Sequence, residues 1–143
     1  LLEAPCDILV PAARPDAITA RNADRIQCKV ILQGANSPVN KMTDYYLSNR
    51  RNIISLSDFI VNSGGIMGCA VELTMKTDTD YKKKVEMKGT RLYTESLINE
   101  TISKNIKQVF SEATARDGTD IFFREKAISL AKNRLQTPED NWL

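Results

Sequence analysis

Three short apolar runs constrain the fold of this chain more than any other feature, and they occupy residues 7–10, 29–32 and 53–56. Each run is followed within two residues by proline, glycine or aspartate, and the runs start 22 and 24 residues apart. Short buried strands with connections of this length are typical of parallel βαβ units, whose crossovers are right-handed. The spacing predicts adjacent parallel strands near residues 7–10, 29–33 and 53–56.

Helical patterns fill the connections between these runs. Residues 17–26 predict a short helix, and residues 39–50 predict a polar helix with Met42, Tyr46 and Leu47 on one side. An α/β fold with a parallel sheet follows from this alternation.

The C-terminal part of the chain changes to a helical period. Apolar residues recur at three- and four-residue steps over residues 97–113 and again over residues 123–135. This spacing is typical of amphipathic helices. Residues 117–120 (DGTD) predict a break and a new helix N-cap between them.

Small residues and asparagines follow the predicted strands, where ligands of parallel sheets bind. The three loops read Pro11-Ala12-Ala13, Gly34-Ala35-Asn36 and Asn62-Ser63-Gly64-Gly65. Such loops would admit a flat ligand and hydrogen-bond its edges. Half of the 6 glycines lie within residues 64–68. They predict either a strand-to-helix turn or a close approach of the backbone to a ligand.

Composition and charge argue against several classes of function. The 20 Lys+Arg and 18 Asp+Glu residues give a net charge of +2, too small to predict nucleic-acid binding. No apolar stretch approaches the roughly 20 residues that cross a bilayer, so we expect no membrane partner. The chain has no histidine and no C-x-x-C, so we expect no metal site. The odd cysteine count (Cys6, Cys28, Cys69) favours a reducing compartment, predicted to be the cytoplasm, with Cys6 and Cys28 as buried thiols.

Four motifs carry a family resemblance, and they read CDILVPAA, ITARNADRI, KVILQGANSP and LSDFIVNSGG. In order and spacing, residues 1–73 resemble the C-terminal half of the cofactor domain of the glutamate/leucine/phenylalanine/valine dehydrogenase family. The resemblance continues more loosely over residues 97–135 and is weakest over residues 76–96. It implies a partial Rossmann-type parallel sheet with a helical C-terminal third. Residues 1–75 would be the second half of an NAD(P)-binding domain, and residues 76–143 a helical segment packed on it.

The resemblance also implies a chemistry and a site. The family catalyses NAD(P)-dependent, reversible oxidative deamination of an L-amino acid to a 2-oxo acid and ammonia. The alanines of the first loop would lie beside the dinucleotide, and the asparagines would hydrogen-bond the nicotinamide ribose and carboxamide side. The glycines would let the backbone pass close to nicotinamide and substrate at a helix N-terminus. The implied cofactor-binding residues are Ala12, Ala13, Asn36, Asn62, Gly64 and Gly65.

Other parts of the family's machinery are not matched in this chain. The G-x-G-x-x-G that binds the pyrophosphate would precede residue 1, and the family's catalytic lysines and aspartate belong to an upstream substrate domain. We therefore assign no catalytic residue, and we expect a fragment of a homo-oligomeric enzyme that has no turnover by itself. Two alternatives stay open: a non-catalytic nucleotide-binding or interaction module, and another Rossmann-type enzyme with coincidental loops.

In the family, the residue four positions after the second glycine of Asn-x-Gly-Gly helps to select the substrate side chain, and in this chain that residue is Cys69. Glutamate enzymes resemble one another in carrying serine there, and enzymes for apolar amino acids carry an aliphatic residue. Cysteine is a small hydrophobe and a weak donor. The neighbours Ala70, Glu72 and Leu73 look more like the leucine-type branch, whereas the Pro-Ala-Ala and Gly-Ala-Asn-Ser-Pro motifs look more like the glutamate branch. A glutamate substrate and a leucine-, phenylalanine- or valine-type substrate both remain open.

Overall fold

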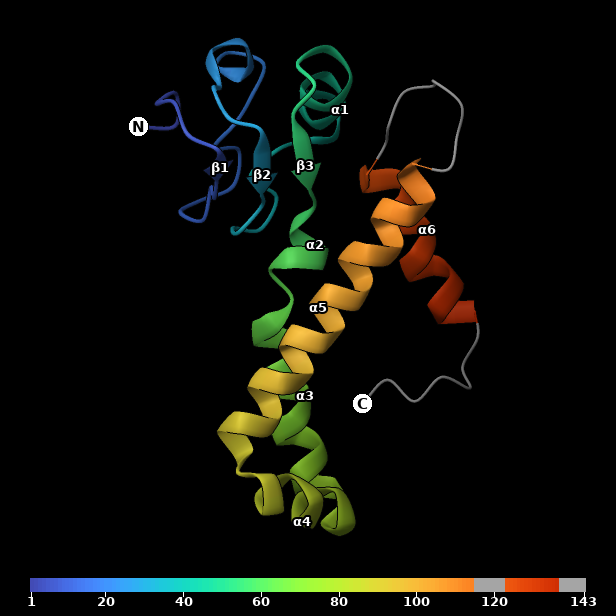
Figure 1. Cartoon of the computed structure of the whole chain (residues 1–143). Coiled ribbons are helices and arrows are strands. Elements are labelled where there is room, and N and C mark those ends of the chain that lie inside the picture. The colour runs from blue at the N-terminus through green and yellow to red at the C-terminus, as the bar shows by residue number, and fades with distance from the viewer. Residues whose placement is uncertain (115–122, 137–143) are drawn as a thin grey trace.

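The computed structural model describes residues 1–114 and 123–136 (Figure 1). Three parallel strands form one sheet in the order β1-β2-β3, with β1 at Ile8–Leu9, β2 at Val30–Leu32 and β3 at Ile54–Leu56. In this register Ile31 lies opposite Ser55. The prediction of three adjacent parallel strands is confirmed, although each strand is shorter than predicted.

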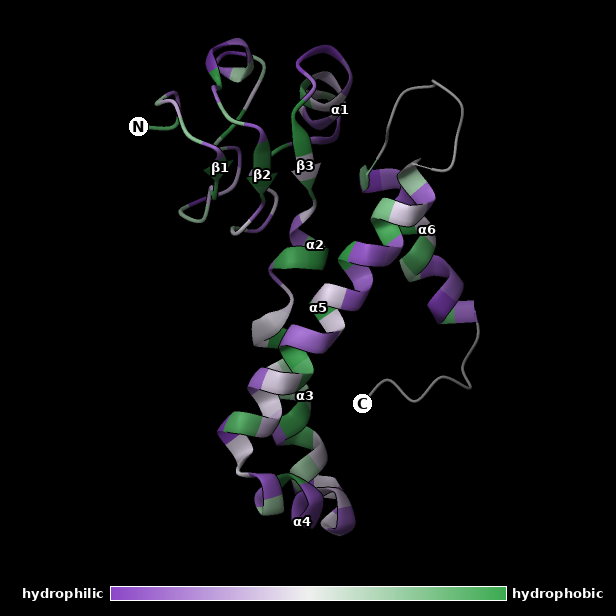
Figure 2. Cartoon of the chain, viewed as in Figure 1, coloured by the Kyte–Doolittle hydropathy of each residue, from purple (hydrophilic) through white to green (hydrophobic). Residues whose placement is uncertain are grey.

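Each face of the sheet packs against its own apolar cluster, because successive strand residues point to opposite faces. Ile31 joins the cluster under α1 (Lys41–Arg50), whose other buried members include Ile18, Val39, Leu47 and Ile53. Leu56 joins the second cluster, which brings in the C-terminal helices through Ile60, Val109, Phe123 and Leu130. Figure 2 shows the strands as hydrophobic. The clusters therefore lie on both faces of the sheet, whereas Ile8 in the edge strand β1 is 57% exposed.

Beyond β3, the described chain is helical. The helices are α2 (Asp58–Val61), α3 (Gly64–Thr77), α4 (Thr79–Lys88), α5 (Thr90–Thr114) and α6 (Phe123–Gln136). The amphipathic helices predicted over residues 97–113 and 123–135 are confirmed as α5 and α6, and α5 begins earlier than predicted. The predicted break at residues 117–120 lies outside the described residues.

Local signals separate the helices that follow Gly64. The Asp78 carboxylate accepts hydrogen bonds from the N–H groups of Asp80 and Tyr81, both at 2.9 Å, and so caps α4. Gly89 has a φ of +79° and ends α4 in a conformation that favours glycine. α3, α4 and the first half of α5 extend away from the sheet (Figure 1), and we call residues 64–102 the helical arm.

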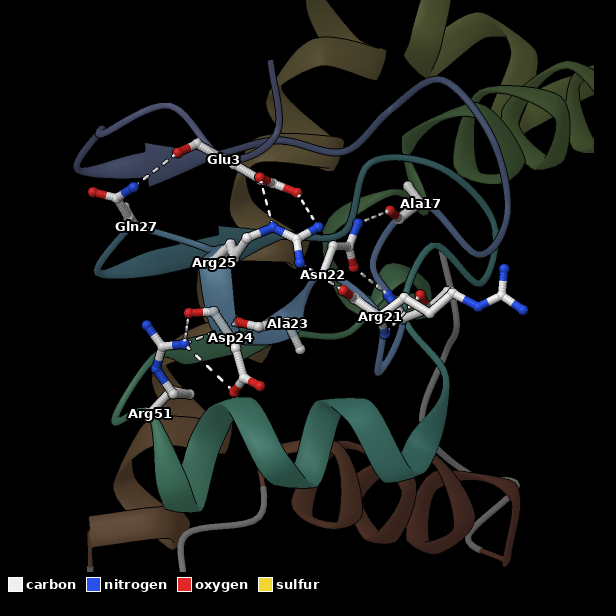
Figure 3. Close-up of polar contacts among 10 residues, drawn as sticks. Glu3, Ala17, Arg21, Asn22, Ala23, Asp24, Arg25, Gln27 and Arg51 are labelled. Atoms are coloured by element: carbon white, nitrogen blue, oxygen red, sulfur yellow. Dashed lines mark hydrogen bonds and ion pairs between the residues drawn. The ribbon is translucent and has the colours of Figure 1, made fainter.

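The helix predicted over residues 17–26 is wrong for most of its length. The structure has a single 3-10 turn there, η1 (Ala23–Arg25). Asn22 provides the physical reason, because its Oδ1 accepts from the Thr19 N–H at 2.8 Å and its amide donates to the Ala17 carbonyl at 3.0 Å (Figure 3). Bonds of this kind give the backbone an alternative to a helix.

Two arginines attach this turn to the rest of the sheet region. Arg51, which follows α1, donates to the carbonyl oxygens of Ala23 and Ile26 at 3.2 and 3.1 Å. Arg25 makes a two-bond ion pair with Glu3 at 2.8 and 2.7 Å (Figure 3). Contacts between distant segments therefore fix a conformation that the local pattern does not specify.

The buried side of α1 also differs from the prediction. Leu47 is buried and Tyr46 is half-buried, but Met42 is 75% exposed. Asp44, instead of Met42, is buried on the side of α1 that faces the sheet. The helix thus presents a charged side chain to the protein interior, and its polar partners are described below.

The cysteines are less buried than predicted. Cys6 is exposed and Cys28 is half-buried, and both are free thiols. Cys6 precedes β1, which pairs on one side with β2 and has no described neighbour on its other side. Its position beside an open sheet edge explains why it is not covered.

Candidate functional site

The loops that follow β1 and β2 pack directly on one another. The Ala35 N–H donates to the Pro11 carbonyl at 2.9 Å. A Cβ atom on Gly34 would lie 3.0 Å from the Ala12 Cβ and 3.1 Å from a Val10 methyl group. Side chains rarely approach so closely, so Gly34 is the residue that allows these two loops to meet.

Asn36 and Asn62 lie together at this edge of the sheet. The Asn62 side-chain amide donates to the Asn36 Oδ1 at 2.9 Å, although 26 residues separate them. Asn36 is exposed and Asn62 is half-buried. Within residues 1–114 and 123–136, the Asn36 Nδ2 and the Asn62 Oδ1 have no protein partner. One amide donor group and one carbonyl acceptor are therefore available to a ligand, and together they complement a carboxamide.

The backbone beside Asn36 is held in the left-handed region. Ser37 has a φ of +47°, which costs a residue with a side chain about 1 kcal/mol or more. Its N–H donates to the Asp58 Oδ2 at 2.8 Å, and its carbonyl accepts from the Asp16 N–H at 3.1 Å. These two bonds fix the loop that carries Asn36.

Helix α3 starts at Gly64, immediately beyond the asparagine pair. A Cβ on Gly64 would lie 3.4 Å from a methyl group of Ile98 in α5, an ordinary van der Waals distance, so α5 packs against this glycine without requiring it. A Cβ on Gly65 would meet nothing within 4 Å. Gly65 is exposed, and no contact in the described part of the chain accounts for it. Cys69 is also exposed, and four residues place it on the same face of α3 as Gly65.

The structure thus gathers the sequence-predicted site residues along one edge and the adjoining helix. Ala12 and Ala13 are exposed at the end of the loop after β1. Asn36 and Asn62 are in contact, and α3 carries Gly64, Gly65 and Cys69. Their roles toward cofactor and substrate stay predictions.

A buried polar network lies beneath this edge, and the sequence reasoning missed it. Gln33 is fully buried at the end of β2, and its amide donates to the Asp44 Oδ1 at 3.2 Å and to the Ser55 Oγ at 3.0 Å. Burial raises the pKa of Asp44, and the hydrogen bond from Ser55 and the charge of Arg124 oppose that rise. A glutamine that closes an apolar strand was the available sequence signal.

Arg124 connects α6 to this network and to the sheet edge. Its Nη1 lies 3.9 Å from the Asp58 Oδ1, and its guanidinium carbon lies 5.6 Å from the centre of the Phe59 ring. The Arg124 and Asp58 side chains are 23% and 14% exposed. Asp58 therefore faces the loop of Asn36 with one carboxylate oxygen and α6 with the other.

Two further findings concern the described ranges. They contain no group of three or more histidine, cysteine, aspartate or glutamate residues arranged to hold a metal ion. None of the helices in these ranges has the length and hydrophobicity needed to span a membrane.

Comparison with known proteins gives a consistent result. Residues 1–139 match the sequence profile of the Glutamate/Leucine/Phenylalanine/Valine dehydrogenase family. A glutamate dehydrogenase of Aeropyrum pernix is 38% identical over 94 residues, which are 62% of this chain and 22% of that enzyme. The NADP-specific glutamate dehydrogenase of Saccharolobus shibatae is 39% identical over 72 residues, or 50% of this chain and 17% of the enzyme. The catabolic NAD-specific glutamate dehydrogenase of Bacillus subtilis is 41% identical over 66 residues, or 46% of this chain and 15% of the enzyme. The chain thus covers about a fifth of the length of these relatives.

Proposed function

The chain belongs to the glutamate/leucine/phenylalanine/valine dehydrogenase family, and we propose that it forms the nicotinamide-side half of the cofactor domain of a glutamate dehydrogenase-like enzyme. The whole enzyme would carry out NAD(P)-dependent, reversible oxidative deamination of an L-amino acid to a 2-oxo acid and ammonia. The contact between Asn62 and Asn36 at 2.9 Å carries this proposal, because it joins two implied cofactor residues at the ligand-binding edge of a parallel sheet.

The residues at the edge fit one end of a nicotinamide dinucleotide. The asparagine pair leaves one donor group and one acceptor free, which matches the carboxamide of nicotinamide. Ala12 and Ala13 are small and exposed, so a flat group can lie against them. Gly65 has open space where a side chain would be, although no contact among the described residues requires glycine there.

Each part of the chain has a distinct task in this proposal. The bound dinucleotide would supply the hydride acceptor for oxidation of the amino acid. Asn36 and Asn62 would orient its nicotinamide end through hydrogen bonds, and Gly65 would let the α3 N-terminus approach it. The packing of Gly34 against Ala12 would keep the two loops in register. No residue of this chain is given an acid–base role.

We further propose that the chain acts within a longer, homo-oligomeric protein and has no turnover alone. The matched segments make up only 15–22% of the relatives' lengths, and the family's pyrophosphate-binding and catalytic motifs have no counterpart in this sequence. The cofactor stays open between NAD and NADP, because one relative is named NADP-specific and another NAD-specific.

A second candidate within the family is an enzyme for an apolar amino acid. Cys69 favours it, because its exposed thiol lies on the Gly65 face of α3 and is a poor donor to a substrate carboxylate. Assays of the full-length protein with L-glutamate, L-leucine, L-phenylalanine and L-valine separate the two. If kcat/KM is much higher for glutamate than for the three apolar amino acids, the protein is a glutamate enzyme. If kcat/KM is higher for one of the apolar amino acids, the second candidate is supported.

Substitution Asn62→Ala in the full-length protein tests the cofactor assignment. We expect kcat/KM for the nicotinamide cofactor to fall about tenfold or more, since one hydrogen bond to the ligand is lost and the Asn36 amide loses its partner. Asn99→Ala is the matched control, because Asn99 is exposed on α5. Thermal unfolding of both variants should stay close to that of the wild type. If Asn62→Ala leaves kcat and the KM for the cofactor unchanged, the proposed site is wrong.

A further inference from the structure

We propose that Arg124 is a positioning residue for the cofactor edge, acting through Asp58 on the loop that carries Asn36. This inference rests on the proposed function, because it concerns the same edge. Arg124 belongs to α6, the last helix of the described residues, and within these residues it makes no hydrogen bond or ion pair with a residue assigned to the cofactor. Its influence would pass through two contacts, from guanidinium to carboxylate and from carboxylate to backbone.

The first step concerns Ser37, the residue after Asn36. Its φ of +47° is unfavourable for a residue with a side chain, so the loop keeps this conformation only if surrounding bonds hold it. The strongest available bond is the one from its N–H to the charged Asp58 Oδ2 at 2.8 Å. A shift of Asp58 would therefore release Ser37 and move the Asn36 side chain relative to Asn62.

The second step concerns what holds Asp58. Its other oxygen, Oδ1, is buried and has no hydrogen-bond partner among the described residues, and the same is true of the Arg124 Nη1 that lies 3.9 Å away. A buried carboxylate is costly without a compensating charge. Arg124 provides that charge, and its guanidinium lies over the Phe59 ring, 5.6 Å from the ring centre. Phe59 follows Asp58 directly, so one arginine restrains two successive residues of α2.

The third step concerns a second acid near the Asp58–Arg124 pair. Asp44 is a second acid close enough to Arg124 and Asp58 for their charges to interact. Removing the guanidinium would leave these two acids without the positive charge that acts on both of them. The Asp58 carboxylate would then move away from the Ser37 N–H or would turn to hydrogen-bond solvent. Either change loosens the loop of Asn36 while the sheet itself stays in place.

The test compares three variants of the full-length protein. Arg124→Met removes the charge and the planar group, and Arg124→Lys keeps a charge but cannot stack as guanidinium does. Arg134→Met is the matched control, because Arg134 also lies on α6 and donates to the Asn105 Oδ1 at 2.7 Å, away from Asp58. For each variant we would measure kcat, KM for the nicotinamide cofactor, thermal unfolding and hydrogen exchange of the Ser37 amide.

We expect Arg124→Met to raise the KM for the cofactor about fivefold, with kcat within about twofold of the wild type. Exchange of the Ser37 amide should accelerate about tenfold, because a charge-assisted bond is weakened. Arg124→Lys should give an intermediate KM. Arg134→Met should change neither the KM nor the Ser37 exchange, even if it lowers the melting temperature.

A double variant covers the case in which Arg124→Met folds poorly. Asp58→Asn/Arg124→Met removes both charges of this partly buried pair, so it should fold at least as well as Arg124→Met. Its KM for the cofactor should match that of Asp58→Asn alone, because both substitutions act on the same link. Additive effects on KM would overturn the inference.

The outcomes separate this inference from the proposed function. If the wild-type protein uses a nicotinamide cofactor but Arg124→Met and Arg124→Lys leave its KM unchanged, the positioning role alone is wrong. An equal rise in KM for Arg134→Met would show general loosening of α6 and would also overturn it. If the wild-type protein neither binds nor turns over NAD(H) or NADP(H), the proposed function and this inference fail together.

Discussion

The sheet region and the helical arm are built in different ways. The sheet region contains the two apolar clusters, one on each face of the sheet. In the arm, the buried residues are Val71 and Val85. Its large apolar side chains include several that are mostly exposed: Ile66, Leu73, Met87 and Leu92.

Local interactions add to the limited packing between the helices of the arm, such as the edge-on contact of the Tyr81 and Tyr93 rings at 5.9 Å. The Asp78 cap and the left-handed Gly89 define its helix boundaries. Ion pairs within one turn, such as Arg91–Glu95 at 2.8 Å, add a few tenths of a kcal/mol each. Helices of this length are marginal in water without tertiary packing. The comparison teaches that the proposed cofactor edge joins a scaffold with a large core to an arm that buries few residues.

The largest contrast should come from equivalent leucine substitutions in the two regions. Leu47→Ala removes a fully buried side chain of α1 and should lower the free energy of unfolding by about 3 kcal/mol. Leu73→Ala removes a side chain that is 64% exposed on α3 and should cost less than about 0.5 kcal/mol. Urea unfolding followed by circular dichroism measures both. Equal losses would show that the arm is packed as tightly as the sheet region.

Two glycines sharpen the contrast at the edge itself. Gly34→Ala places a Cβ 3.0 Å from the Ala12 Cβ, and we expect a loss of about 1–2 kcal/mol as the loops move apart. Gly65 lies in α3, and a Cβ at this position would have no atom within 4 Å. Gly65→Ala should therefore stabilise the chain by up to about 1 kcal/mol, because alanine is the better helix former. The proposed function adds a second expectation for Gly65→Ala, which is weaker binding of the nicotinamide cofactor. Melting temperatures and cofactor titrations of the full-length protein check both, and a gain in stability without any loss of binding would count against Gly65 as a cofactor contact.

The smallest effect concerns pH and the buried acid of the sheet region. Burial raises the pKa of Asp44 above its ordinary value of 3.8, so the folded chain binds this proton more tightly than the unfolded chain does. The resulting stabilisation is complete below pH 3.8 and is lost as pH rises through the raised pKa. Asp44→Asn lacks this dependence, so wild type should lose stability relative to Asp44→Asn between pH 3.8 and neutrality. Urea unfolding across this range tests the expectation, and a difference that stays constant with pH would contradict it.

The matched control in the arm is Glu72→Gln, because Glu72 is an exposed acid. This substitution should change the free energy of unfolding by less than about 0.5 kcal/mol.

The sequence by itself determined the framework of this protein. The three apolar runs specified the strands and their parallel order, because short runs separated by long connections have few other arrangements. Three- and four-residue spacing specified α5 and α6, since a helix needs only a continuous apolar stripe. The loops after the strands had to meet at one edge once the strands were parallel, so the contact between Asn36 and Asn62 followed from the topology.

The tertiary structure alone decided which polar groups the interior holds. Residues 17–26 have a helical pattern, but the Asn22 side chain and the contacts of Arg51, which follows α1, favour an open turn. Met42 was expected on the same side of α1 as Tyr46 and Leu47 but is exposed. Asp44 is the buried residue, because Gln33 after β2 and Ser55 in β3 both hydrogen-bond its carboxylate. The pairing of Arg124 with Asp58 joins residues that are 66 positions apart (124 minus 58). Periodicity reports the burial of apolar surface along one element. A buried charge is stabilised by polar partners on other elements, and these partners come close to it only when the chain has folded.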